Sequence, residues 1–217
     1  MTEDPDGGAG SSAGSGQGDG LGDLVEADVA AAVRASARAY ADALAARDAK
    51  AAATWEAPET FVFYDDLRLA ALHSTRTQLE NWPLLTLVMI LELRARIGAE
   101  ELGALDGRAL FERTITEGLE GAEGVDMQEV AIDDDGLHAR ILLEGQPLLL
   151  LRRDEAAAGA RWLVDLPALI ELMAPGFEVL ARERVSADGK VATALIFVEM
   201  RMGSAVDSAI ADTPPIP

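Results

Sequence analysis

Residues 125–166 read VDMQEVAIDDDGLHARILLEGQPLLLLRRDEAAAGARWLVDL, and this stretch decides the fold class. Apolar and polar residues alternate along much of it, which is the pattern of strands with one buried face. Turns that contain Asp, Gly or Pro separate four such runs. Because the connections are short, neighbouring strands should be antiparallel and follow chain order. We therefore predict a four-stranded meander with strands at residues 125–132, 137–143, 148–152 and 161–166.

The chain before this stretch has helical spacing instead. Apolar residues recur every three or four positions between residues 24 and 55, which predicts a long amphipathic helix with a break near Asp48. Pro58 suits the first turn of a second helix, because the missing N–H of proline is not needed there. The same spacing continues from Pro58 to about His73.

A strongly apolar helix is expected next. Residues 84–91, after Pro83, are apolar nearly all round, so this helix should be buried on most sides. Asp106 then suits the N-cap of another helix over residues 108–119. The first half of the chain is therefore predicted to be helical.

Helices are expected again after the sheet. Pro167 suits the start of a helix that Pro175 and Gly176 should interrupt, because an internal proline removes a helical hydrogen bond. Apolar residues at helical spacing predict a last helix over residues 191–202. A strand over residues 192–200 is the alternative, because part of that segment lacks a clear polar face.

These patterns together predict an α+β fold in which a helical N-terminal half packs on a four-stranded antiparallel meander and C-terminal helices close the chain. Residues 24–203 are expected to form one domain. Residues 1–23 are rich in Gly, Ser, Ala and Asp and nearly lack apolar side chains, so we predict a disordered tail there. Residues 204–217 are predicted to be a flexible C-terminal tail.

The charge and the absence of cysteine exclude several classes of function. The chain has 18 Lys and Arg against 38 Asp and Glu, a formal net charge of −20. Such a surface repels polyanions, so nucleic acid and anionic membranes are not expected as partners. With no Cys, disulfides, thiol nucleophiles and Cys-based zinc sites are excluded. No apolar run approaches the roughly 20 residues that a membrane span needs.

The N-terminal residues bear on localisation. They lack a basic start followed by an apolar run, so we predict a cytoplasmic protein. The alternative is an exported lipoprotein whose signal has been removed, because a Gly/Ser-rich linker often follows such a signal.

Short segments of the chain resemble nuclear transport factor 2-like, or SnoaL-like, domains. Such domains typically open with a helix, a break at an acidic residue and an aromatic-rich segment, and a Trp begins their last strand. The resemblance implies a curved antiparallel sheet wrapped by helices into a cone with an apolar pocket. The superfamily includes isomerases, cyclases, dehydratases and non-catalytic binding or assembly domains. The matching segments are residues 39–48, Trp55 and residues 61–65, 148–154 and 161–166. Residues 66–120 depart from the family pattern, because they predict several helices where a typical member has fewer helices and an early strand.

Three side chains are the candidates for catalysis. Tyr64 with Asp66 or Asp165 could polarise a carbonyl group and move a proton at an apolar pocket. Each also has a structural interpretation. Tyr64 can pack in the core while Asp66 lies in water, and Asp165 can cap the helix that starts near Pro167.

Trp55 and Trp162 are the candidates for lining a ligand site, although large aromatic side chains also serve as core anchors. His138, just after a turn, is either a general base at a pocket mouth or a partly exposed strand residue. No metal site is expected. Asp133, Asp135 and Glu144 match positions one, three and twelve of a calcium loop, but position five is Leu137 and position six is His138 instead of glycine. No cofactor motif is present.

The sequence therefore supports three hypotheses about function. The first is a domain that binds an apolar small molecule or a partner without catalysis. The second is a small isomerase or lyase that acts on an apolar carbonyl compound. The third is a structural or assembly subunit, such as a homodimer, in which the apolar helix after Pro83 or the final helix meets a partner.

Overall fold

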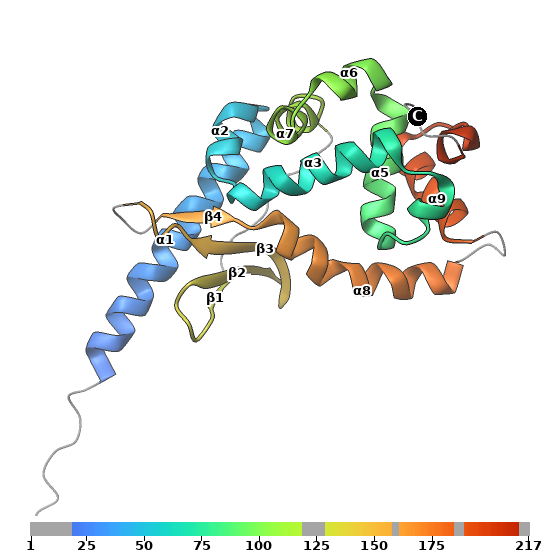
Figure 1. Cartoon of the computed structure of the whole chain (residues 1–217). Coiled ribbons are helices and arrows are strands. Elements are labelled where there is room, and N and C mark those ends of the chain that lie inside the picture. The colour runs from blue at the N-terminus through green and yellow to red at the C-terminus, as the bar shows by residue number, and fades with distance from the viewer. Residues whose placement is uncertain (1–18, 119–128, 158–160, 185–188, 213–217) are drawn as a thin grey trace, which may run out of the picture.

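A computed structural model describes residues 19–118, 129–157, 161–184 and 189–212. Its described elements are helices, then strands, then helices, which confirms the predicted α+β class (Figure 1). The elements are α1 (Asp19–Ala45), α2 (Ala49–Thr54), α3 (Pro58–His73), α4 (Arg76–Leu79), α5 (Leu84–Arg96), α6 (Ala99–Ala104), α7 (Gly107–Thr116), β1 (Glu129–Ile132), β2 (His138–Leu143), β3 (Gln146–Arg153), β4 (Trp162–Val164), α8 (Leu166–Arg184), α9 (Lys190–Met202) and the 3₁₀ helix η1 (Ser208–Ala211).

Local sequence signals explain most helix starts. The predicted break near Asp48 separates α1 from α2, and the Asp48 carboxylate accepts a hydrogen bond from the Ala51 N–H as an N-cap. Pro58 occupies the first turn of α3, and Asp106 caps α7. These predictions are confirmed. They depend only on residues within one helical turn.

The four strands form an antiparallel sheet in the order β1-β2-β3-β4, which confirms the predicted meander. Residues 125–128 of the first expected strand lie outside the described residues. A short segment from Trp55 to Ala57 runs parallel to β4. Val164 donates its N–H to the Trp55 carbonyl at 2.7 Å, and Ala57 donates to the Val164 carbonyl at 2.8 Å. The edge of β4 is therefore paired instead of open.

The two faces of the sheet differ. One face packs against α1 and contributes buried side chains to the core, namely Ala139, Ile141, Leu151, Trp162 and Val164. The opposite face alternates with it and carries His138, Arg140, Leu150, Arg152 and Leu163. The first four of these are partly or largely exposed. This second face is called the open face below.

The helices form the other part of the core. Figure 1 shows the sheet at one end and α5 and α9 at the other, with α3 and α8 running between them. The apolar helix α5 contacts α3, α8 and α9, and Leu84, Leu87, Ile90 and Leu91 are fully buried. Because other helices of the same chain cover α5, this helix is not available as a contact surface for a partner. The assembly hypothesis therefore depends on the final helix, its other proposed contact surface.

The structure corrects two predictions about helices, the break at Pro175 and the start of the first helix, and decides between the two alternatives for residues 191–202. Helix α8 continues through Pro175 instead of breaking there. Both halves are held by tertiary contacts, since Ile170 is buried and Glu178 accepts a hydrogen bond from the Leu84 N–H. Residues 190–202 form a helix, so the alternative strand is wrong. Helix α1 begins at Asp19, within the stretch predicted to be a disordered tail.

The C-terminal residues also differ from the predicted flexible tail. Residues 208–211 form η1, which contacts α5 and α9, and Ala211 is fully buried. Asp212 forms an ion pair with Arg76 at 2.6 Å. The segment therefore packs on the domain through contacts that its own short sequence does not announce.

The hairpin between β2 and β3 offers a simple test of the turn. Leu143 pairs with Gln146, so Glu144 and Gly145 form a two-residue loop, and their φ angles are 52° and 75°. Two positive φ angles define a type I′ turn, which favours Asn-Gly. We expect Glu144→Asn to raise the free energy of unfolding by about 1 kcal/mol, because a side chain such as Glu is strained in this conformation.

Urea denaturation of the purified chain measures this change. Glu155→Asn, in the turn after β3, is the control and is expected to leave the midpoint within error, because its φ is not positive. An unchanged or lowered stability of Glu144→Asn contradicts the assignment of the turn.

Candidate functional site

The structure does not bring the three predicted catalytic residues together. Tyr64 is only 1% exposed and packs edge-on against Phe111, with ring centroids 5.3 Å apart. Asp66 is exposed on α3. Asp165 accepts a hydrogen bond from the Ala168 N–H at 3.1 Å and so caps α8. Tyr64 and Asp165 line different hollows, and Asp66 lines none of the four described here.

The two candidate tryptophans also have structural surroundings. Trp162 is 1% exposed and belongs to the core on the side of the sheet that faces α1, where its backbone N–H donates to the Ser36 hydroxyl at 3.3 Å. Trp55 is partly buried, and the Arg161 guanidinium lies 5.0 Å above its ring. Neither tryptophan lines one of the four hollows.

Tyr64 instead lines a small cavity beside a buried carboxylate. The Glu92 side chain is 6% exposed, and its two oxygens accept hydrogen bonds from Arg96 at 3.0 Å and Arg201 at 2.9 Å. The cavity measures about 40 Å³, so it has room for little more than water. With both oxygens held by guanidinium groups, Glu92 ties α9 to α5 and is not placed to accept a proton from a substrate.

Sequence reasoning did not single out Glu92, because it stands at the end of the apolar run and looks like its solvent-exposed limit. The signal that could have found it is Arg96, four residues later, on a helix that is apolar nearly all round. A carboxylate on such a helix is buried unless the chain leaves one side open.

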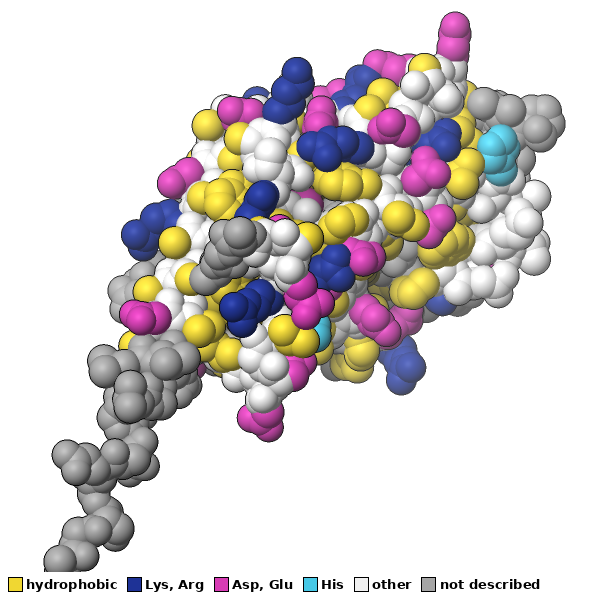
Figure 2. All heavy atoms as spheres, turned by 60° about the vertical axis from the view of Figure 1, so that its left-hand side comes forward, with side chains coloured by type: hydrophobic (Ala, Val, Ile, Leu, Met, Phe, Trp, Pro, Cys, Tyr) yellow, Lys and Arg dark blue, Asp and Glu magenta, His cyan; other side chains and the backbone are white. Residues whose placement is uncertain are grey.

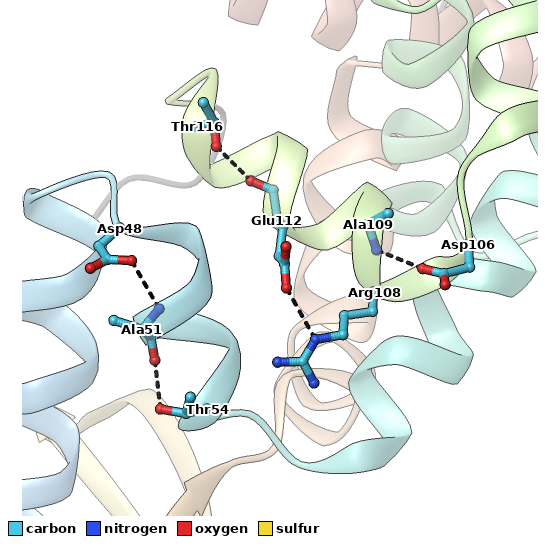
Figure 3. Close-up of polar contacts among 8 residues, drawn as sticks. All are labelled: Asp48, Ala51, Thr54, Asp106, Arg108, Ala109, Glu112 and Thr116. Carbon is cyan, nitrogen blue, oxygen red and sulfur yellow. Dashed lines mark hydrogen bonds and ion pairs between the residues drawn. The ribbon is translucent and has the colours of Figure 1, made fainter.

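The carboxylates around a hollow between α2 and α7 also have structural roles (Figure 3). Figure 3 shows Asp48 and Asp106 each pointing at the backbone N–H that it caps, and Arg108 reaching along α7 to Glu112. These carboxylates are therefore committed to holding helix ends and helix surfaces. They do not converge on a common point in the hollow.

The open face of the sheet is the best candidate site. Two hollows of about 350 Å³ and 250 Å³ lie on it, and His138 lines both. The larger is bounded by Pro58 of α3, and the smaller by Leu172 of α8. Volumes of this size are at the lower end of those that hold small molecules. The two hollows thus meet at one polar side chain between two helices.

Leucine side chains supply most of the apolar lining. Leu163 and Leu137 line the larger hollow, and Leu150 and Leu172 line the smaller one. Leu150 and Leu163 point away from the face that packs on α1, because they alternate with the core residues of β3 and β4. The two hollows therefore combine apolar surface with several ionisable groups, such as Arg152 and Asp154 in the larger one and Arg140 and Asp165 in the smaller one.

Three basic side chains on the open face are paired with carboxylates at its border. The His138 Nδ1 lies 2.7 Å from the Asp135 carboxylate, and Arg140 pairs with Asp133 at 2.6 Å. The third pair joins Arg152 to Glu59 of α3 and is the one of the three that links two distant parts of the chain.

Asp135 is also held by its own turn. Its carboxylate accepts backbone hydrogen bonds from Leu137 at 2.8 Å and from His138 at 3.1 Å. The Leu137 bond, followed by the His138 side chain, lowers the pKa of Asp135 below its usual value.

The side of the molecule that carries α1 and the sheet has a mixed surface. Figure 2 shows dark blue and magenta side chains interspersed with yellow ones, without a continuous stripe of one charge. Such a surface does not present the basic track that nucleic-acid binding needs.

Comparison with known proteins identifies no class for this chain: no family model, no curated protein and no solved structure matches it. The resemblance to nuclear transport factor 2-like domains therefore stays a prediction. Among the helices in the described ranges, none has the length and apolar character that crossing a bilayer requires. The described part of the chain also holds no group of three His, Asp or Glu side chains arranged for a metal ion.

Proposed function

We propose that this chain is a small-molecule-binding domain and that its ligand, an apolar molecule, lies on the open face of the sheet. The observation that carries the proposal is that two hollows on one sheet face meet at His138 and are lined by leucines. Burial of these leucines by a ligand supplies the driving force, at roughly 25 cal/mol for each Å² of apolar surface removed from water.

The described geometry favours binding over the two alternatives. The isomerase or lyase hypothesis needs Tyr64 beside Asp66 or Asp165, and these residues share no described hollow. The assembly hypothesis loses α5 as a contact surface, although Ile196 and Met200 of α9 remain exposed. A distant relation to nuclear transport factor 2-like domains would fit a binding role, and we retain it as part of this proposal.

A pair of substitutions on one helix tests the location of the site. Leu172 and Val179 of α8 are 49% and 54% exposed, so aspartate should be tolerated at both positions. Only Leu172 lines the smaller hollow. We expect Leu172→Asp to weaken binding of 1-decanol about tenfold, because a charge at the wall must be desolvated by the ligand, and Val179→Asp to leave binding unchanged.

The measurement is the ligand-induced shift in thermal unfolding of the full chain, followed by calorimetric titration. Saturating ligand should raise the melting temperature, since a ligand at 100 times its Kd stabilises the folded state by about 2.7 kcal/mol. The proposal is wrong if apolar probes of this size do not stabilise the wild-type chain, or if the two variants weaken binding equally.

A further inference from the structure

The basic side chains of the open face are concentrated at its centre. His138 and Arg140 lie two residues apart on β2 and so point to the same side, and Arg152 of β3 pairs directly with His138. Acidic residues outnumber basic ones by 38 to 18 in this chain, so three adjacent basic positions are a local reversal of its charge.

Arg140 and Arg152 lie diagonally across β2 and β3 on this face, and like charges so close on neighbouring strands destabilise a sheet unless they are neutralised. Here the neutralising groups stand at the border: Asp133 and Asp135 in the turn after β1, and Glu59 in the first turn of α3. The open face thus has a basic centre and an acidic border.

The three border carboxylates differ in how firmly they are held. Asp135 accepts two backbone N–H groups besides His138. Asp133 lies in the short turn that leads into β2, the strand that carries its partner Arg140. Glu59 comes from a different part of the chain, its side chain is 57% exposed, and Arg152 is the only partner of its carboxylate within the described ranges. Glu59 is therefore the carboxylate that can leave.

From this we infer that the ligand of the open face is an amphipathic monocarboxylic acid whose carboxylate binds Arg152 in place of Glu59. The inference rests on the proposed function and specifies its ligand. Glu59 accepts one hydrogen bond from Arg152, whereas a guanidinium group can bind a carboxylate through two parallel hydrogen bonds, so a ligand carboxylate can replace the bond that Glu59 gives up.

The residues around Arg152 indicate the chemistry of the rest of the ligand. Pro58, Leu137 and Leu163 line the same hollow and offer apolar surface to a hydrocarbon body. Arg153, Asp154 and Glu155 line it as well, but Arg153 follows Arg152 on β3 and so points to the opposite face of the sheet. A second acidic group on the ligand would therefore meet the two carboxylates and be repelled. This combination selects one carboxylate on an apolar body.

Calorimetric titration of the full chain with decanoate and with 1-decanol tests the inference, because the two probes share their apolar body. We expect decanoate to bind the wild-type chain more tightly than 1-decanol. Arg152→Gln should weaken decanoate about tenfold and leave 1-decanol unchanged. Glu59→Gln should strengthen decanoate about threefold, which is the effect of removing a competing surface ion pair, and also leave 1-decanol unchanged.

Glu100→Gln is the charge-matched control. Glu100 is exposed on α6, which lies across α3 from the sheet (Figure 1), so its loss changes the net charge equally without touching the site. A larger gain for Glu59→Gln than for Glu100→Gln supports displacement, and equal gains overturn it.

Other outcomes separate the two proposals. If both probes bind the wild-type chain equally, or if Arg152→Gln weakens both alike, the acidic ligand is rejected and an apolar site remains. If neither probe binds the wild-type chain, the proposed function itself is rejected, and the inference fails with it.

Discussion

Replacing Arg94 with methionine is expected to lower the free energy of unfolding by about 3 kcal/mol. Arg94 is buried, and its Nε donates to the Ala71 carbonyl at 2.7 Å. Its two terminal nitrogens donate to Ala70 and Ser74 in the same helix end and to Ile210 at 2.8 Å.

These four bonds explain the size of the effect. The acceptors are carbonyls at the end of α3, of which only that of Ala70 also accepts a backbone N–H, from Ser74, and a carbonyl of η1. Burial lowers the pKa of Arg94 from its usual value, but a guanidinium group stays protonated in proteins and complements the negative end of the α3 dipole. Methionine fills similar space and leaves all four carbonyls without this donor.

Thermal unfolding measures the loss, which corresponds to a melting temperature lower by about 6–12 °C in a chain of this length. Arg76→Met is the control, because Arg76 contacts the same C-terminal segment through an exposed ion pair with Asp212. An exposed pair contributes about 0–1 kcal/mol. If Arg94→Met costs no more than Arg76→Met, the carbonyls are satisfied by water and our account of Arg94 is wrong.

Gly107→Ala is expected to cost about 3 kcal/mol or more and to prevent folding if the chain is marginally stable. A Cβ atom at Gly107 would lie 1.9 Å from the Phe61 carbonyl oxygen and 2.7 Å from the Asp65 nitrogen. Both are backbone atoms of α3, so no side chain can rotate away. Helix α7 would have to move from α3 and separate the packed rings of Phe61 and Phe111.

The same substitution elsewhere gives the matched control. Gly176 lies inside α8, and a Cβ atom there meets nothing within 4 Å. Gly176→Ala should therefore raise the free energy of unfolding by about 0.5–1 kcal/mol, because alanine loses less backbone entropy in a helix. Chemical denaturation of both variants tests the pair. Comparable stabilities would show that α3 and α7 are not in backbone contact.

Prediction from sequence succeeded where the residues that determine a structural element lie within one short segment. Asp48, Pro58 and Asp106 each mark a helix start through groups within one turn, and the alternation after residue 124 is enough to indicate strands. It failed at Pro175, where the local cost of an internal proline is real but contacts on both sides hold α8 together.

The candidate site was harder to predict than the fold. His138 was recognised as a residue at a possible pocket mouth, but Arg152 and Glu59 were not linked, because 93 positions separate them in the chain. Tyr64 was a candidate for catalysis, yet the carboxylate that shares its cavity is Glu92 and not Asp66 of its own helix or Asp165 before α8. Pairings of this kind have no local signal.

The sequence by itself determined most of the helices, the four strands and their order, and the large negative charge of the chain. Those properties depend on residue types and their spacing. Only the tertiary structure decided that α1 covers one face of the meander, so that His138, Arg140 and Arg152 lie on the open one. It also decided that Glu92 is buried and that η1 docks on α5. The physical reason is that burial depends on what packs against a residue, and the packing partners come from distant parts of the chain.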